Sequence, residues 1–250
     1  MMIDYLTYFF LVLAIALIIW YLYGWLWGNE GQNEQWKIAV KHGKVSVELQ
    51  RYYRRYPDKQ RFVLFWLQAQ HLQTAAEDAV VAELGVYQGD TARLIELLFP
   101  RHELFLFDTF EGFQEKHLAL ESGEAATYTS GHFADTSLAR VQERLLPGGK
   151  VRFFKGDFAT TSIELPERSY AFVSIDVDLG QPTKAGLEYF YPRLIPGGVI
   201  IIHDYHPKWP TLMQAVDNFL NTIPEEGVLM PDRNNSMVIV KNKTTPIASQ

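Results

Sequence analysis

Apolar residues form one long unbroken run at the start of the chain, followed by short, spaced runs from residue 79 onward. The first run, residues 5–27, carries no charge and is long enough to cross a bilayer as a helix. Aromatic residues crowd both of its ends, as at the two interfaces of a membrane. The alternatives are a buried core helix or a signal peptide, but the basic start and small-residue cleavage site typical of a signal peptide are missing. We expect an N-terminal transmembrane helix, with residues 1–28 as a membrane anchor.

Lysine and arginine are absent before this run and frequent after it, from Lys37 to Arg55. Because positive residues stay on the cytoplasmic side, this asymmetry predicts a single-pass protein whose globular part is cytoplasmic. The basic cluster at residues 51–61 could contact anionic lipid headgroups, although an ordinary solvated helix face is the commoner meaning of such a pattern.

Beyond residue 45 the pattern changes to helices and then to alternating strands and helices. Two helices are expected between residues 45 and 75, separated near residues 56–58. The alternation that follows predicts the α/β class, with a Rossmann-like, doubly wound parallel sheet. The expected strands are 79–86, 104–107, 151–154, 171–175 and 197–202, the expected helices are 91–98 and 182–194, and a closing β-hairpin is expected from 227–231 and 236–242.

This pattern divides the rest of the chain into three parts. Residues 29–78 form a linker and the helices that precede the main domain, residues 79–242 form the main domain, and residues 243–250 form a flexible tail. Within the main domain, the stretch from 112 to 149 has a clear helix only near its end, where Asp135 or Thr136 could supply the cap. Such a long connection is usually a functional lid or disordered.

Composition narrows the function classes. A net charge of −6 and a pI near 5.7 argue against nucleic acid as a partner. The chain has no cysteine, which excludes disulfides and thiolate metal sites.

A glycine-containing turn follows the first expected strand, in the pattern E-x-G-x-x-x-G formed by Glu83, Gly85 and Gly89. Glycines at such a turn let a ligand approach the backbone closely. Asp108 ends the second strand, where it can accept hydrogen bonds from ribose hydroxyls. The pattern is not G-x-G-x-x-G, which argues against a nicotinamide oxidoreductase. A nucleoside-bearing ligand without a diphosphate fits best, and a purely structural turn is the alternative.

Polar residues also end the two later strands: Asp176 and Asp178 after the first, His203 and Asp204 after the second. The carboxyl ends of parallel strands border the ligand crevice, so these groups should converge and could hold a divalent cation. Alternatively, Asp178 caps the next helix and His203 is satisfied in a turn.

Six segments of the chain, read together, resemble the macrocin-type sugar O-methyltransferases, which are class I S-adenosylmethionine enzymes. The segments are VAELGVYQGDTARL, FDTFEGF, FADTSLARV, KGDFATT, SIDVDLGQPTKAGLEYFYPRLIPGGVIIIHDY and AVDNFL. The resemblance spans about residues 50–240 and implies a seven-stranded sheet with an antiparallel last strand. It implies that S-adenosylmethionine binds through Glu83, Gly85, Tyr87 and Gly89 at its methionine part, Asp108 at its ribose and Gly156, Asp157 and Phe158 at its adenine.

The resemblance also implies a Mg²⁺ site, whose ligand positions fall on Asp176, His203 and Asp204. An acidic residue is usual at position 203, and imidazole suits Mn²⁺, Fe²⁺ or Zn²⁺ better than Mg²⁺. We expect Mg²⁺ or Mn²⁺. Proton acceptors for the acceptor hydroxyl would be Asp178, His203 or, from the lid, His132. For His132 the commoner alternative is a loop residue without a function.

We therefore expect a membrane-anchored O-methyltransferase that acts on a sugar or glycan-like acceptor, either a small molecule or lipid-linked, at the cytoplasmic membrane face. A homo-oligomer is compatible with the sequence. The alternative is a catalytically silent module of the same fold that binds a partner at the membrane, which the substitution at His203 would explain.

Overall fold

The structure, a computed structural model, describes residues 2–27 and 33–243, with side chains for residues 5–22 and 33–243. The chain divides into two compact units, Met1–Val45 and Ser46–Gln250. The expected linker falls partly, and the expected tail almost wholly, outside the described residues. Helices α3, Val47–Arg55, and α4, Lys59–His71, belong to the second unit and pack against its helix α5, Asp90–Leu98.

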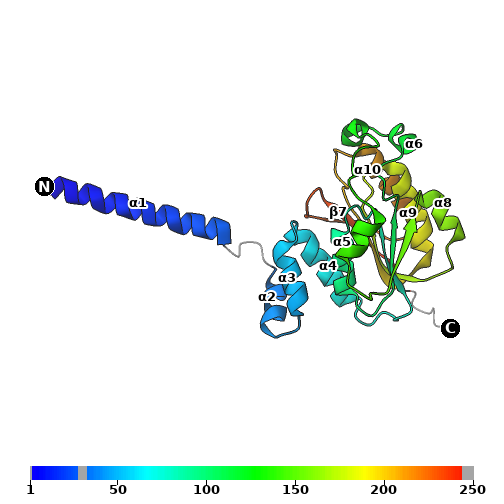
Figure 1. Cartoon of the computed structure of the whole chain (residues 1–250), viewed down its shortest axis with the longest axis horizontal. Helices are drawn as coiled ribbons and strands as arrows, with labels where there is room; N and C mark the ends of the chain where they lie inside the picture. The colour runs from blue at the N-terminus through cyan, green and yellow to red at the C-terminus, as the bar shows by residue number, and fades with distance from the viewer. Residues whose placement is uncertain (1, 28–32, 244–250) are drawn as a thin grey trace. The chain divides into compact units, whose positions relative to one another are not determined.

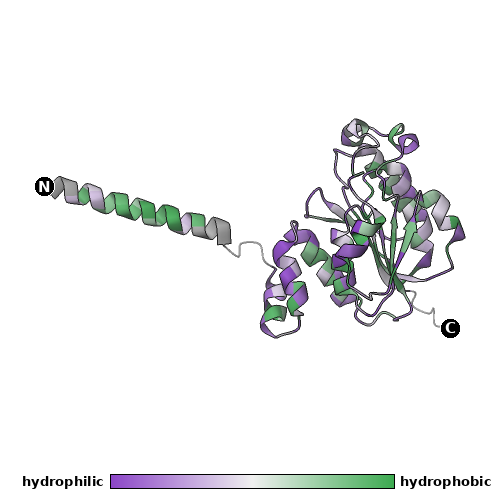
Figure 2. Cartoon of the chain, in the orientation of Figure 1, coloured by the Kyte–Doolittle hydropathy of each residue, from purple (hydrophilic) through white to green (hydrophobic). Residues whose placement is uncertain are grey.

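Helix α1, Met2–Trp27, makes up most of the first unit (Figure 1). Its segment Tyr5–Leu22 is long and apolar enough to cross a membrane, and its side chains are exposed on all sides. Figure 2 shows that most of the described part of this helix is apolar. Helix α2, Glu34–Lys41, is capped by the side chain of Asn33.

The second unit is built on one seven-stranded sheet with strand order β3-β2-β1-β4-β5-β7-β6. Strands β1 to β5 run parallel, whereas β7 runs antiparallel to both of its neighbours, which confirms the predicted closing hairpin and the antiparallel last strand. The strands are β1 Val80–Leu84, β2 Leu104–Asp108, β3 Val151–Lys155, β4 Tyr170–Ile175, β5 Leu194–Ile202, β6 Val228–Met230 and β7 Ser236–Val240.

Helices cover the sheet in two groups (Figure 1). One group packs around α5 and the other around α9, as the strand order of a doubly wound sheet requires. The first group is α3 Val47–Arg55, α4 Lys59–His71 and α5 Asp90–Leu98, and the second is α8 Phe158–Thr161, α9 Gly180–Arg193 and α10 Pro210–Leu220.

An irregularity in β4 supplies aromatic side chains to both helical groups. The register shifts between Tyr170 and Phe172, so these two residues do not share one face as strict alternation would require. Tyr170 meets Phe190 of α9, and Phe172 meets Phe65 of α4. The buried rings fix both groups of helices on β4, the strand that Asp176 follows.

Three local expectations need correction. Helix α7, Leu138–Arg144, is capped by Ser137, whose hydroxyl accepts from the Arg140 amide, and not by Asp135 or Thr136. Helix α9 begins at Gly180, two residues before Pro182, because Leu179 already adopts the non-helical cap conformation. Strand β5 begins at Leu194, three residues before the expected start at residue 197.

Candidate functional site

A cavity of about 220 Å³ opens at the carboxyl ends of β1, β2 and β4. Such a position is where open α/β sheets bind ligands. All of the residues predicted to bind the cofactor line this cavity, except Gly89: they are Glu83, Gly85, Tyr87, Asp108, Gly156, Asp157 and Phe158.

Two glycines shape the turn after β1. Gly85 has φ +88°, and a Cβ there would lie 2.0 Å from the carbonyl oxygen of Asp176, so only glycine lets this turn pack on the loop after β4. Gly89, with φ +85°, forms the cap of α5, and a Cβ there would meet Val141 of α7 at 2.9 Å. Gly89 therefore shapes the turn from behind and does not face the cavity.

The Asp108 carboxylate holds this turn in place. Its Oδ2 accepts from the amides of Val86 at 2.6 Å and Tyr87 at 2.9 Å, and its Oδ1 accepts from the amide of Phe110 at 2.6 Å. Carboxylate oxygens have further lone pairs. Asp108 can therefore order the cavity wall and still accept a hydrogen bond from a ligand hydroxyl.

Glu83 brings a buried carboxyl group to the cavity. Its side chain is 1 % exposed, and its Oε2 has no hydrogen-bond partner among the described residues. Burial, with the charges of Asp176 and Asp108, raises the pKa of Glu83 well above its usual range. An unpartnered carboxyl oxygen in this position fits a ligand that brings a donor or a positive charge.

A lid segment, residues 112–137, covers one side of the cavity. It contains the short helix α6, Glu115–Leu118, and a 3₁₀ turn, Gly123–Thr127, neither of which the sequence pattern predicts. Lys116 and His117 of α6 lie within ion-pair distance of Asp157, so the lid is joined to the predicted adenine end of the cavity.

Aromatic rings line the cavity at the other end of the lid. Phe113 and Phe133 lie edge to face with centroids 5.3 Å apart, and Phe133 meets Tyr87 at 5.0 Å. The Tyr87 hydroxyl donates to Asp135 of the lid at 2.8 Å. Phe133 remains 38 % exposed, so this wall presents a ring surface to whatever enters the cavity.

His132 lies in the same lid but does not line the cavity. Its side chain is exposed, and its Nδ1 accepts from the backbone amide of Thr129 at 2.9 Å. The prediction that His132 acts as a proton acceptor therefore has no support from its position, which is that of a loop-stabilising residue.

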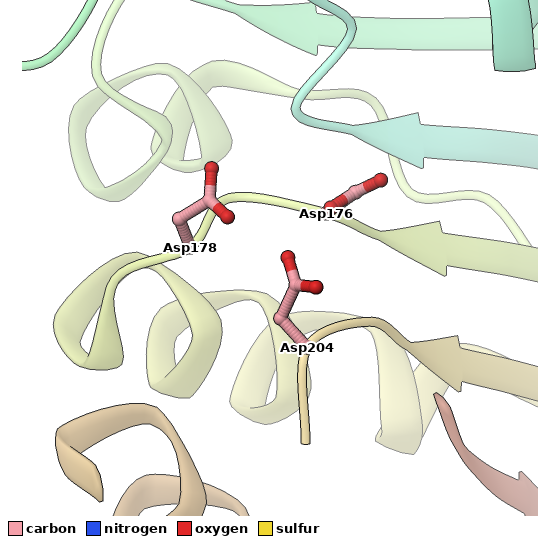
Figure 3. A group of neighbouring side chains, drawn as sticks. All are labelled: Asp176, Asp178 and Asp204. Atoms are coloured by element: carbon pink, nitrogen blue, oxygen red, sulfur yellow. The ribbon is translucent and has the colours of Figure 1, made fainter. Parts of the chain in front are cut away.

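Three carboxylates converge beside the cavity: Asp176, Asp178 and Asp204 (Figure 3). One oxygen from each lies within 4.8 Å of the others, as ligands of a single metal ion would. The first two follow β4 and the third follows β5. Asp178 and Asp204 both have φ +57°, a left-handed conformation that is strained for these residues and frequent at functional sites.

The environment of this cluster disfavours three negative charges. Burial raises the pKa of Asp176 to about 7; Arg61 opposes the shift, and Asp204 adds to it. Burial and the charge of Asp176 raise the pKa of Asp178 well above its usual range. The cluster is thus suited to hold protons or a cation near neutral pH.

Arg61, which sequence analysis did not single out, brings a fixed positive charge to this cluster from α4. Its Nη1 donates to Oδ2 of Asp176 at 3.2 Å, and its Nε donates to Oδ2 of Asp232 at 3.4 Å. On the other side, Asn234 donates to Oδ1 of Asp204 at 2.9 Å. Two residues before β7 thus help to orient the cluster: Asp232 acts on Asp176 through Arg61, and Asn234 acts on Asp204 directly.

His203 does not join the carboxylates, contrary to the predicted metal site. It is buried, its Nε2 lies 3.0 Å from the Ser174 hydroxyl, and its Nδ1 lies 2.9 Å from the Ser236 hydroxyl. The Ser236 hydroxyl donates to Asp232 at 2.6 Å, so it must accept from Nδ1–H, and Nε2 then accepts from Ser174.

Burial, with the charge of Arg61, lowers the pKa of His203 well below its ordinary value, so the imidazole is neutral. Both ring nitrogens are already engaged, which leaves neither a lone pair for a metal nor a site for a substrate proton. His203 instead connects β4, β5 and β7. The third carboxylate beside Asp176 and Asp204 is that of Asp178, in the place that was expected for His203.

The model of the family described as Macrocin-O-methyltransferase (TylF) matches residues 67–227. The 8-demethyl-8-(2,3-dimethoxy-alpha-L-rhamnosyl)-tetracenomycin-C 4'-O-methyltransferase of Streptomyces olivaceus is 28% identical to this chain. The match covers 54% of this chain and 57% of that enzyme. The mycinamicin III 3''-O-methyltransferase of Micromonospora griseorubida is 29% identical over 54% of this chain and 59% of its own. The matched region therefore spans less than two thirds of these curated relatives.

Solved structures show the same fold. The O-methyltransferase NovP superposes with a TM-score of 0.65 at 20% identity, over 74% of this chain and 81% of NovP. The calicheamicin methyltransferase CalS11 superposes with a TM-score of 0.60 at 23% identity, over 72% of this chain and 78% of CalS11.

Proposed function

Because the chain belongs to the macrocin-O-methyltransferase family, we propose that it transfers the methyl group of S-adenosylmethionine to a hydroxyl of a sugar or glycan-like acceptor. The observation that supports this most directly is the cavity at the ends of β1, β2 and β4, with three carboxylates at its side. A nucleoside site and a hydroxyl-activating site then adjoin each other, as methyl transfer requires.

The cavity residues fit the cofactor chemically. Glu83, buried and with an unpartnered oxygen, would face the positively charged methionine end, and Asp108 would accept from the ribose. Asp157 and Phe158 would flank the adenine, with Phe158 held against Phe107. Gly85 lets the turn after β1 pack on the loop after β4, so that both segments border the cavity.

The carboxylate cluster fits a divalent cation, and its all-oxygen donor set favours Mg²⁺. Asp176 and Asp204, which follow adjacent strands, would hold the cation while Arg61 and Asn234 orient their carboxylates. A bound cation would lower the pKa of an acceptor hydroxyl and fix its position.

Asp178 is the proton acceptor that the geometry favours. It lines the cavity and also lies beside the other two carboxylates, whereas His203 and His132 do neither. A cation held by Asp176 and Asp204 would favour the ionised form of Asp178, which would then take the hydroxyl proton during methyl transfer. The in-line displacement needs this proton removed as the new bond to oxygen forms.

The acceptor would enter along the aromatic wall of Phe113, Phe133 and Tyr87. Ring faces can pack against the C–H face of a sugar, while its hydroxyls turn toward the carboxylates. Helix α1 would anchor the protein in the membrane through residues 5–27, with the catalytic unit cytoplasmic, where a lipid-linked glycan is one accessible acceptor.

A transfer assay tests this proposal. Full-length protein in nanodiscs is incubated with methyl-labelled S-adenosylmethionine, Mg²⁺ and lipid-linked glycans extracted from membranes, with simple catechols in a parallel reaction. We expect the label on a glycan hydroxyl. Methylation of catechols alone would contradict the acceptor class, and labelling of neither would contradict the activity.

A further inference from the structure

The outer face of helix α3 carries three arginines without a counter-charge. Arg51, Arg54 and Arg55 are spaced by three and four residues, so they form one stripe along the helix, and all three are exposed. No ion pair or hydrogen bond of their side chains occurs within the described part of the chain. Leu49 and Tyr53, by contrast, are the buried residues of this helix.

The single acidic residue of α3 does not neutralise this stripe. Glu48 forms an ion pair with Arg93 of α5, so its charge is already compensated within the second unit. The Tyr52 hydroxyl donates to the carbonyl of Asp90 at 2.7 Å, which fixes the rotation of α3 against α5. The helix is thus held with its uncompensated arginines turned outward.

An exposed aliphatic side chain lies on the same stripe. Val47 precedes Arg51 by one helical turn and is 62 % exposed. Binding to an anionic membrane surface combines electrostatic attraction of basic residues with burial of apolar area, and the stripe offers both.

The stripe also lies close in sequence to α1. Helix α3 begins 20 residues after α1 ends at Trp27, and Lys41 and Lys44 lie between the two, also exposed. The chain as a whole is acidic, with a net charge of −6, so this basic concentration is local. Juxtamembrane basic clusters are attracted to the negative cytoplasmic leaflet.

We propose that the stripe formed by Val47, Arg51, Arg54 and Arg55 binds anionic lipid headgroups of the membrane that α1 spans. The proposal rests on the membrane anchoring of the proposed function. Anchored by α1 and attached by α3, the catalytic unit would lie against the bilayer instead of tumbling at the end of a tether.

The absence of cysteine from the chain allows a clean test. Full-length protein with Val47→Cys, labelled with a donor fluorophore, is placed in nanodiscs that contain a headgroup-labelled acceptor lipid. The nanodiscs are made of phosphatidylcholine alone or of phosphatidylcholine mixed with phosphatidylglycerol. We expect higher energy transfer in the anionic nanodiscs at low salt and a decrease toward the phosphatidylcholine value at high salt.

Replacing all three arginines by glutamine should abolish the difference between the two lipid compositions. Each arginine removed should lower the ratio of docked to undocked protein about fivefold. The matched control replaces Lys150, Lys208 and Lys243 by glutamine, which changes the net charge equally at sites away from α3. This control should keep the lipid dependence.

Equal energy transfer in both lipid compositions would overturn the proposal, as would an equal loss in the control variant. Separation of the protein from nanodiscs on gel filtration would overturn both the anchor and the headgroup contact. Binding of S-adenosylhomocysteine, measured on the same samples, reports separately on the methyltransferase function and confirms that each variant is folded.

Discussion

At the scale of single residues, His203 is a buried histidine whose two ring nitrogens lie next to the hydroxyls of Ser174 and Ser236. The sequence places it at a strand end beside Asp204, where a metal ligand is expected. Only the fold brings Ser174 and Ser236 to its two ring nitrogens. The substitution that motivated a catalytically silent module therefore has a structural explanation.

Restoring an acidic residue at this position should destabilise the protein. In His203→Asp, a buried carboxylate would face the Ser236 oxygen, whose proton is already donated to Asp232. We expect a loss of about 3 kcal/mol in the free energy of unfolding, measured with urea. His203→Asn, which keeps a donor near the Nδ1 position, should lose less. Unchanged stability with tighter Mg²⁺ binding in His203→Asp would show that the position is a metal site after all.

Asp178 is the residue on which the proposed proton transfer depends. Asp178→Asn should lower the turnover number about 10²–10⁴-fold, because the amide cannot accept the hydroxyl proton. Binding of S-adenosylhomocysteine should stay within twofold, roughly, of the wild type. The exposed Asp78 supplies the control, since Asp78→Asn should retain full turnover. Normal turnover in Asp178→Asn would remove this residue from the mechanism.

The carboxylate cluster also predicts how stability depends on pH. The folded-state pKa of Asp176, about 7, lies above the ordinary 3.8, so the native state binds the proton more tightly than the unfolded state. Stability without divalent cation should therefore be greatest below pH 4, as far as this group is concerned, and decrease as the pH rises to about 7.

Adding Mg²⁺ should reverse this loss, because it compensates the ionised cluster. We expect the increase in melting temperature on adding Mg²⁺ to be larger at about pH 8 than at about pH 5. Asp176→Asn should remove most of the difference. An equal increase at both pH values would argue against a cation at this cluster.

At the scale of elements, apolar runs located every strand of the sheet, because strands buried on both faces leave little room for polar residues. Helix ends were harder to predict, since Ser137, Asp135 and Thr136 are all competent caps and tertiary packing selects among them. Helix α10 had a readable signal, with Pro210 at its start and Leu212 and Val216 buried at helical spacing, that the strand-helix alternation did not bring out.

The arrangement of the site was less predictable than its parts. Arg61 and Asp176 are 115 positions apart, and an arginine in an amphipathic helix gives no sign that it will meet a carboxylate cluster. The lid likewise could be located by its length, but its aromatic wall could not, because Phe113, Phe133 and Tyr87 come from separate segments.

The lid makes a prediction of its own. Phe133→Ala should raise the KM for the glycan acceptor about tenfold by removing part of the aromatic wall, without changing the affinity for S-adenosylhomocysteine. Leu120 is also exposed in the lid but does not line the cavity, so Leu120→Ala should leave the KM unchanged. An effect of Phe133→Ala on the cofactor alone would assign the wall to the cofactor instead.

At the scale of the whole molecule, the sequence identified an apolar helix and an α/β unit, and the structure contains both. The family model begins at residue 67, so α1 lies outside the matched region and its role has to be argued from its own composition. The domain limits at residues 28, 78 and 242, the cytoplasmic orientation and a homo-oligomeric state remain predictions.

Membrane insertion of α1 can be tested with charges. Leu13→Lys with Leu17→Lys places two cations in the middle of the apolar segment, each costing about 3 kcal/mol in the bilayer centre. We expect this variant to be absent from membranes that have been washed with carbonate. Leu120→Lys with Ile163→Lys, which adds the same charge at exposed sites, should stay in it. Equal retention of both variants would contradict a membrane-spanning α1.

The central claim is that the cavity between β1, β2 and β4 binds S-adenosylmethionine, and calorimetry of the full chain with S-adenosylhomocysteine tests it most directly. We predict binding of one molecule per chain, weakened at least about tenfold in Asp108→Ala, which removes both the ribose acceptor and the support of the turn after β1. The absence of binding by the folded wild-type protein would contradict the account.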